Sequence, residues 1–269
     1  MPDLFLVDSH CHLDFADFTE DRDAIVERAR QAGVGLLVTI STRVARFADL
    51  LAITRRYDNV FASVGTHPLN AAEEPHCTVD EYIRLSSEPR VVAIGEAGLD
   101  YHYDRTPRDV QMSVFRRQIE ASRETQLPLV IHARAADADM EAVLVEESGK
   151  GAFPFILHCF SSGPRLAAVG VELGGYVSFS GIAAFPKSDE LRKIAAEVPR
   201  DRLLIETDAP YLAPPPYRGK RNEPAHVVHT ATRLADALGL SLDELGKITS
   251  DNFFRLFRKV PDPRTGSSS

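Results

Sequence analysis

Eight short apolar runs, separated by helical patterns, constrain the fold of this sequence most strongly. The runs are rich in Val, Ile, Leu and Phe and are nearly continuous rather than alternating, which is typical of strands buried on both faces of a parallel sheet. They cover residues 4–10, 33–41, 60–67, 91–98, 127–133, 153–159, 175–181 and 202–208. Strand–helix alternation repeated eight times predicts an α/β fold, the (β/α)8 TIM barrel, because right-handed crossovers close such a sheet.

The segments between the runs carry the amphipathic stripes expected of covering helices. Residues 21–32 place charge on one side and apolar residues on the other, and residues 107–125 open with Pro at a helix start. A further amphipathic stretch, 241–257, follows the last strand. No Gly- or Ser-rich linker divides the 269 residues, so we predict one barrel domain over 1–260 and a disordered tail over 261–269.

Ionisable side chains fall at the ends of most of these predicted strands. In a TIM barrel all carboxyl ends of the strands meet at one mouth, where the active site lies. Side chains far apart in sequence therefore converge there. The residues at these positions are His10, His12, His67, Glu96, His132, His158, Glu206 and Asp208.

This convergence favours a metal centre over a purely structural cluster. Five of the nine histidines of the chain would share one rim with three acids, and such groups resist desolvation unless a cation is present. Imidazole with carboxylate suits Zn²⁺ or Mn²⁺, and Mg²⁺ less well. The donors exceed the needs of one tetrahedral ion, so the sequence predicts two divalent metal ions.

Several motifs together resemble the TatD family of metal-dependent deoxyribonucleases, within the wider amidohydrolase-like superfamily. The resemblance runs over roughly residues 4–257. It rests on DSHCHLD, GTHP, IGEAGLDY, IHAR, HCFSSG, and ETDAPYLAP followed by RGKRNEP. It implies a TIM barrel, two divalent metals, and hydrolysis of DNA phosphodiester bonds in the 3′ to 5′ direction.

The resemblance also implies roles for single residues. His10, His12 and Asp208 are expected to bind one metal, His132 and His158 the other, and Glu96 both. Asp208 and Glu96 are the expected catalytic residues, with Asp208 accepting a proton from the attacking water.

His67 and Glu206 are carried over as groups that contact substrate or support the metal ligands. The predicted fourth strand contains no lysine, so Glu96 itself supplies the bridging carboxylate. This disfavours a dihydroorotase- or phosphotriesterase-like assignment.

Net charge and cysteine content limit the partners and the compartment. A net charge of −8 disfavours a broad basic face for long nucleic acid, so single-stranded DNA ends are the expected substrate. Three cysteines without C-x-x-C spacing favour a reducing, cytoplasmic setting. The sequence shows no secretory signal and no membrane span, and we expect a monomer.

Substrate contacts are predicted from two loops. Arg218, Lys220 and Arg221 follow the eighth strand and are candidate phosphate contacts, against the alternative of a solvated face. Tyr101 and Tyr103, close to Glu96, could stack a base, or could pack structurally. Two other functions stay open: hydrolysis of another ester or amide, such as an aminoacyl ester on tRNA, and a metal-binding scaffold without catalysis.

Overall fold

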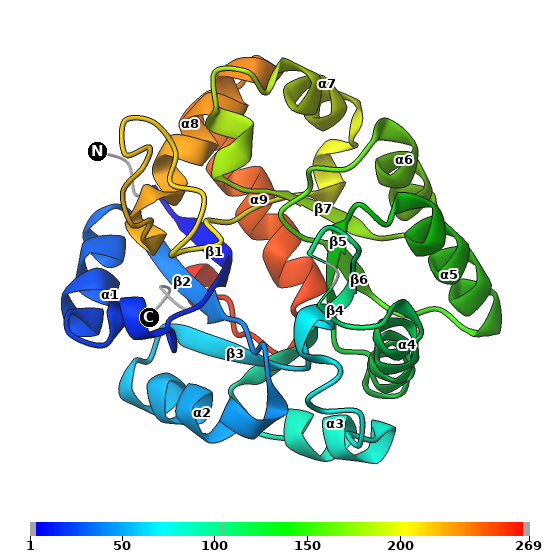
Figure 1. Ribbon diagram of the computed structural model, residues 1–269. Coiled ribbons are helices and arrows are strands. Elements are labelled where there is room, and N and C mark those ends of the chain that lie inside the picture. Colours follow the sequence, from blue (N-terminus) through cyan, green and yellow to red (C-terminus); the bar gives the residue numbers. More distant parts are fainter. Residues whose placement is uncertain (1–3, 104, 266–269) are drawn as a thin grey trace.

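Eight parallel strands form one sheet that curls into a nearly closed barrel, with the helices around it (Figure 1). The computed structural model describes residues 4–103 and 105–265. The strand order is the sequence order, as in a (β/α)8 TIM barrel, which confirms the predicted fold. The strands are β1 (Leu6–Cys11), β2 (Val34–Thr39), β3 (Val60–Val64), β4 (Val91–Asp100), β5 (Leu129–Arg134), β6 (Phe155–Leu157), β7 (Tyr176–Phe179) and β8 (Leu203–Ile205).

Helices follow each strand, and the helix after β2 was not singled out from the sequence. They are α1 (Arg22–Gln31), α2 (Phe47–Arg56), α3 (Val79–Ser86), α4 (Arg108–Thr125), α5 (Asp137–Lys150), α6 (Pro164–Glu172), α7 (Asp189–Glu197), α8 (Val227–Leu238) and α9 (Leu242–Leu256). Strands β6 and β8 are shorter than predicted, so His158, Glu206 and Asp208 lie just beyond them. Among the described residues, no helix is both long and apolar enough to cross a membrane.

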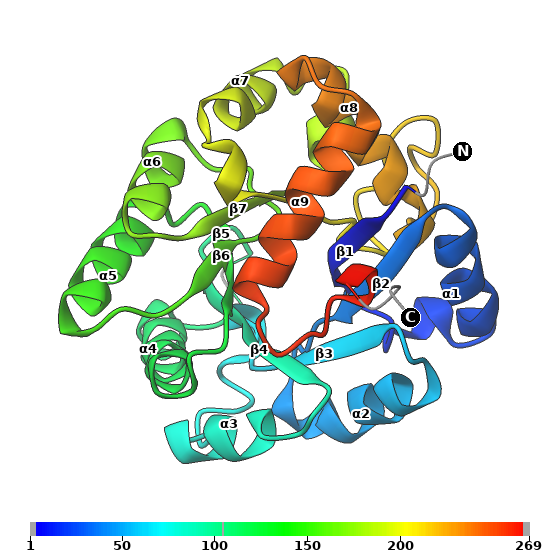
Figure 2. The same cartoon turned by 180° about the vertical axis from the view of Figure 1, so that it is seen from behind.

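Helix α9 lies across the end of the barrel at which the strands begin (Figure 2). Ser250 Oγ donates to the carbonyl of Phe5, and Asn252 Nδ2 donates to that of Leu203, at the starts of β1 and β8. Phe253 and Phe257 share an apolar cluster with barrel-lining residues such as Val7. The helix therefore closes the floor of the barrel and leaves the opposite end as the mouth.

Residues 261–265, at the start of the predicted tail, contain a short turn. Pro263–Thr265 forms a 3-10 turn. The guanidinium of Arg264 pairs with Asp251 at 2.9 Å and with Asp262 at 2.7 Å, and it lies over the ring of Phe254. These contacts dock residues 261–265 on α9. Residues 266–269 lie outside the described residues.

Glycines let β3, β4 and β5 approach closely beside the mouth. A Cβ at Gly65 would lie 2.4 Å from Cα of Gly95, and one at Gly98 would lie 2.0 Å from the carbonyl oxygen of His132. Gly95 and Gly98 also have φ angles of +120° and +132°, a backbone conformation that residues with a side chain rarely adopt. The glycines of the IGEAG segment thus bring Glu96 against the neighbouring strands.

The seam between β8 and β1 is held by few main-chain contacts and by one buried carboxyl group. The amide of His12 donates to the carbonyl of Ala209, and that of Asp208 to His10. Asp8 accepts from the Thr207 amide at 2.8 Å and from Thr207 Oγ1 at 2.6 Å. Burial raises the pKa of Asp8 to about 8, although the Thr207 hydrogen bonds oppose this. At neutral pH the group is therefore largely an uncharged clamp across the seam.

We expect Asp8→Ala to lower the free energy of unfolding by about 2–4 kcal/mol, because two buried donors of Thr207 lose their acceptor. Asp8→Asn should cost less than about 1 kcal/mol, since an amide still accepts from the Thr207 amide. Urea unfolding of the metal-free proteins at pH 7 measures both values. Equal costs for the two variants would contradict the clamp.

Candidate metal centre

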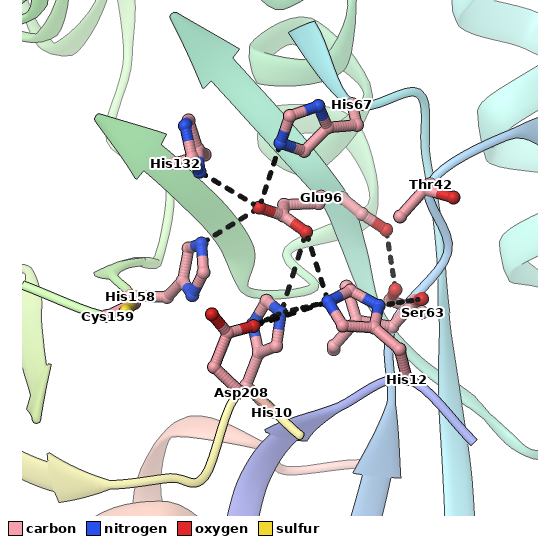
Figure 3. Close-up of polar contacts among 12 residues, drawn as sticks. His10, His12, Thr42, Ser63, His67, Glu96, His132, His158, Cys159 and Asp208 are labelled. Atoms are coloured by element: carbon pink, nitrogen blue, oxygen red, sulfur yellow. Dashed lines mark hydrogen bonds and ion pairs between the residues drawn. The ribbon is translucent and has the colours of Figure 1, made fainter. Parts of the chain in front are cut away.

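Glu96 occupies the middle of a ring of histidines at the mouth (Figure 3). Its Oε1 lies 3.3 Å from His67 Nε2, 3.2 Å from His132 Nδ1 and 2.9 Å from His158 Nε2. The side chain is only 4% exposed. Burial opposes its ionisation, but the surrounding histidines outweigh burial and hold the pKa of Glu96 well below its usual range. One ionised oxygen therefore faces three imidazoles.

The other oxygen of Glu96 faces a second set of donors. Oε2 lies 3.5 Å from His10 Nε2 and 3.8 Å from His12 Nε2. Asp208 Oδ1 lies 3.6 and 3.4 Å from the same two nitrogens, which are 3.2 Å apart. Donors bound tetrahedrally at 2.0–2.1 Å stand about 3.3–3.4 Å from one another. These separations therefore fit a divalent cation.

Hydrogen bonds behind the imidazoles turn their free lone pairs toward the centre. His12 Nδ1 donates to the carbonyl of Ile40 at 3.1 Å, which leaves Nε2 as the donor atom for a metal. His132 Nε2 lies 3.0 Å from Asp100 Oδ2, which leaves Nδ1 toward Glu96. Carbonyl and carboxylate partners of this kind fix the tautomer and orientation of metal-binding histidines.

Glu206 lies behind one histidine from each set. Its Oε1 accepts from His158 Nδ1 at 3.1 Å, and its side chain is fully buried. Its Oε2 and His10 Nδ1 are both buried without a hydrogen-bond partner among the described residues. His10, His158 and Glu206 nevertheless offer donor atoms within 4.8 Å of one another, and the two rings stack 3.9 Å apart. Glu206 is thus placed to orient the ring of His158, and it lies close to the ring of His10.

His67 differs from the other histidines because its ring accepts a hydrogen bond. The amide of Leu69 donates to His67 Nδ1 at 3.1 Å. Burial lowers the pKa of His67, which favours the neutral ring. A neutral ring that accepts at Nδ1 carries its proton on Nε2, so His67 offers an N–H toward Glu96 rather than a lone pair. Its geometry is that of a hydrogen-bond donor in the mouth.

Comparison with known proteins agrees with this fold. The family model described as TatD related DNase matches residues 7–258. The uncharacterized metal-dependent hydrolase YcfH of Escherichia coli is 41% identical over 257 residues, covering 94% of this chain and 96% of YcfH. This chain belongs to the TatD family. The uncharacterized metal-dependent hydrolase YabD of Bacillus subtilis is 38% identical, with 94% and 99% of the two chains covered.

A solved TatD structure shows the same arrangement of the whole chain. The crystal structure of YJJV, a TatD homologue from Escherichia coli K12, superposes with a TM-score of 0.86 and 29% identity. The match covers 97% of this chain and all of that one. The barrel that positions the mouth residues of this TatD-family protein therefore has the same fold as that of a solved TatD homologue.

Metal binding to this TatD-family site should release protons. Burial alone would lower the pKa of His12, but its hydrogen bond to Asp208 and the charge of Glu96 raise it to about 9. A metal needs the unprotonated ring. Although burial opposes it, contacts with carboxylates also raise the pKa of His132 and His158, so more than one proton competes with the metal. We therefore expect metal affinity to rise by at least about tenfold per pH unit up to about pH 9. Calorimetric titration in buffers of different ionisation enthalpy measures the protons released.

The same shift has an opposite effect on the metal-free protein. The folded pKa of His12 exceeds its unfolded value of ~6.5, so its stabilising contribution is fully present below about pH 6.5. It is lost as pH rises through about 9. Metal binding that releases no proton at pH 7, or whose affinity does not change with pH, would contradict the protonation of His12.

We expect Glu206→Ala to weaken metal binding about 10- to 100-fold, the range for removing a group that orients metal-binding histidines. Glu206→Gln should have a smaller effect, because its amide oxygen can still accept from His158. Metal titration at pH 8 measures both. The control is Glu124→Ala, an exposed carboxylate on α4. Unchanged affinity in Glu206→Ala would contradict the orienting role.

The loop after β8 contains three cationic side chains predicted as phosphate contacts. Arg221 donates to Asp21 at 2.6 and 3.0 Å, so its charge is already paired. The guanidinium of Arg218 lies 3.5 Å from the ring centre of Phe185. Lys220 is exposed. Contact of these three side chains with substrate stays a prediction. The ion pair with Asp21 weighs against a phosphate contact by Arg221.

Tyr101 is held by neighbouring side chains. Its hydroxyl donates to Asp139 at 2.7 Å, and the Arg108 guanidinium lies 4.1 Å from its ring centre. A base would have to displace Arg108 to stack on that face, so base stacking by Tyr101 stays an untested prediction.

Two site residues were missed in the sequence. Asp100, which orients His132, follows Glu96 by four positions on β4, and strand residues separated by an even number share a face. Asp8 precedes His10 by two positions. In both cases, the even spacing of an acidic residue from a candidate ligand on the same strand could have identified it.

Proposed function

We propose that this TatD-family metal-dependent hydrolase cleaves phosphodiester bonds of DNA, removing nucleotides 3′ to 5′ from single-stranded ends, with two divalent cations as cofactors. The observation that carries the proposal is the division of the Glu96 carboxylate between two donor sets. Oε2 faces His10, His12 and Asp208, and Oε1 faces His132 and His158. Glu96 would therefore supply one oxygen to the ion held by each set. The imidazole-rich set favours Zn²⁺ or Mn²⁺ over Mg²⁺.

Such ions, when bound, acidify a water and offset the negative charge that builds on a phosphoryl group. The chain supplies the proton acceptor. Asp208 is 15% exposed at its side chain, whereas Glu96 is 4% exposed, so Asp208 is the carboxylate that an entering water meets. Burial opposes its ionisation, but the contacts with His12 and His10 outweigh burial and lower the pKa of Asp208. It is therefore ionised and able to accept a proton.

His67 supplies a hydrogen-bond donor. Its Nε2–H points into the mouth from the Glu96 Oε1 side, 3.3 Å from that oxygen. A phosphoryl oxygen held between the two donor sets would accept this N–H, and an oriented donor stabilises charge that grows on such an oxygen. His67 thus contacts substrate rather than metal in this proposal.

Purified protein loaded with Mn²⁺ or Zn²⁺ tests the function on three substrates: a 5′-labelled single-stranded oligonucleotide, the same strand in a blunt duplex, and aminoacyl-tRNA. We expect a ladder that shortens from the 3′ end of the single strand, slower cleavage of the duplex, and no cleavage with a chelator present. Release of the amino acid without DNA cleavage would overturn the proposal in favour of ester hydrolysis. Binding of metal without hydrolysis of any substrate would favour a scaffold.

A further inference from the structure

Two exposed tyrosines lie on loops at the barrel mouth. Among the described residues, the large apolar side chains with the most exposure are Tyr103, Val145 and Tyr211, at 47%, 51% and 54%. Val145 lies on α5, away from the strand ends. The tyrosines follow β4 and β8, the strands that bring Glu96 and Asp208 to the site. Exposed aromatic rings beside a reaction centre are available to stack on a planar ligand.

Tyr211 is tied to the donor set of His10, His12 and Asp208. Its amide donates to the carbonyl of Asp208 at 2.9 Å. Its ring lies edge-on to Phe15, with centres 6.1 Å apart, and Phe15 in turn stacks on His12 at 4.6 Å. Tyr211 and Phe15 therefore form a short aromatic shelf, which begins directly at a candidate metal ligand.

Tyr103 is tied to the opposite donor set. Its amide donates to Asp100 Oδ1 at 3.2 Å, and the other oxygen of Asp100 holds His132. Two guanidinium groups lie near its ring, that of Arg134 at 4.8 Å and that of Arg105 at 5.3 Å from the ring centre. Arg134 also donates to the Tyr103 hydroxyl at 3.4 Å. This cluster of Tyr103, Arg105 and Arg134 is cationic and exposed.

The shelf and the cationic cluster lie on opposite sides of the candidate metal site. The shelf begins at His12, on which Phe15 stacks, whereas Tyr103 contacts Asp100, which holds His132. The metal centre lies between them, because Glu96 contacts both donor sets. One side of the mouth thus offers stacking and the other offers positive charge.

We propose that the aromatic shelf of Tyr211 and Phe15 stacks an unpaired nucleobase while Arg134 and Arg105 hold a neighbouring phosphate, so that the bond between them lies over the metal centre. This subsite rests on the proposed action on DNA. A base inside a duplex is already stacked and paired and cannot reach the shelf. The subsite therefore accounts for a preference for single-stranded ends in a protein whose net charge is −8.

The stacking half is tested by binding a short fluorescent single strand in Ca²⁺, which replaces the metal that supports cleavage. A matched strand carries abasic residues at its last two positions. We expect Tyr211→Ala to bind the normal strand roughly 5- to 150-fold more weakly, the loss for one stacked base. Its affinity for the abasic strand should equal that of the unmodified protein. Tyr211→Phe should restore binding, because phenylalanine keeps the ring.

The phosphate half is tested by the salt dependence of the same binding. We expect Arg134→Gln to weaken both strands alike and to reduce the slope of log K against log salt by about 0.7, one phosphate contact on a single strand. The control is Arg84→Gln on α3, whose side chain is 69% exposed, and it should leave the slope unchanged.

The outcomes separate the subsite from the function. If the unmodified protein cleaves the single strand but Tyr211→Ala and Arg134→Gln bind both strands normally, the subsite is wrong and the function stands. If Tyr211→Ala weakens the abasic strand as much as the normal one, the ring does not stack a base. If the unmodified protein binds and cleaves neither strand, the action on DNA itself fails.

Discussion

Replacing Glu96 with alanine is expected to lower kcat/KM about a thousandfold or more. The carboxylate turns one oxygen toward each donor set, so in the proposed two-metal site its loss would remove a ligand from both ions. A thousandfold loss corresponds to about 4 kcal/mol of transition-state stabilisation. Steady-state kinetics and metal analysis of the same samples measure the effect. The number of metal ions bound per chain should fall together with the rate.

Circular dichroism and thermal unfolding of Glu96→Ala should show that the barrel is folded, since β4 keeps its main-chain pairing. Glu190→Ala on α7, with a side chain 85% exposed, is the matched control and should keep full activity. A Glu96→Ala protein that retains more than about a tenth of the rate has lost less than ~1.4 kcal/mol, and such a result would show that Glu96 is not a shared ligand.

Asp208→Asn should separate metal binding from proton transfer. The asparagine keeps an oxygen near His10 and His12 but cannot accept a proton at neutral pH. We expect kcat to fall about 10²- to 10⁴-fold, the usual contribution of a general base, with a smaller loss of metal affinity. Rates at saturating metal, together with titration of the metal, distinguish the two effects.

The control for Asp208→Asn is Asp17→Asn, an exposed carboxylate in the loop after β1. If Asp208→Asn loses its metal but regains a normal rate when metal is added to saturation, Asp208 serves in metal binding alone. A normal rate and normal affinity together would remove it from the site.

The sequence was sufficient to predict the barrel and the converging residues. Long-range convergence of His10 with Asp208 follows from topology, since parallel strands of one barrel end at one mouth. The strand order of the barrel is therefore enough to bring these side chains together. The two donor sets that face Glu96 contain the residues that the family resemblance implies as metal ligands, and their metal-binding roles stay predictions.

The hydrogen bonds that orient the ring nitrogens were not predictable in the same way. His67 follows β3 and His132 lies within β5, and both were predicted at strand ends. The amide of Leu69 makes His67 a hydrogen-bond donor at Nε2, whereas Asp100 leaves His132 as a candidate ligand. These differences depend on local main-chain geometry, which residue type and spacing do not specify. The ion pair of Arg221 with Asp21 joins residues 200 positions apart on two loops, for which no periodicity exists.

The floor of the barrel has a consequence for synthesis on the ribosome. All eight strands emerge before α9, and the apolar cluster that contains Val7 and Phe253 cannot form until the helix has followed. At roughly 5–20 residues per second, some 250 residues separate the start of β1 from the end of α9 by about 12–50 s. Until α9 has emerged, the lining residues of this cluster lack the packing that Phe253 supplies, and we expect chaperone holding at this stage to raise the yield.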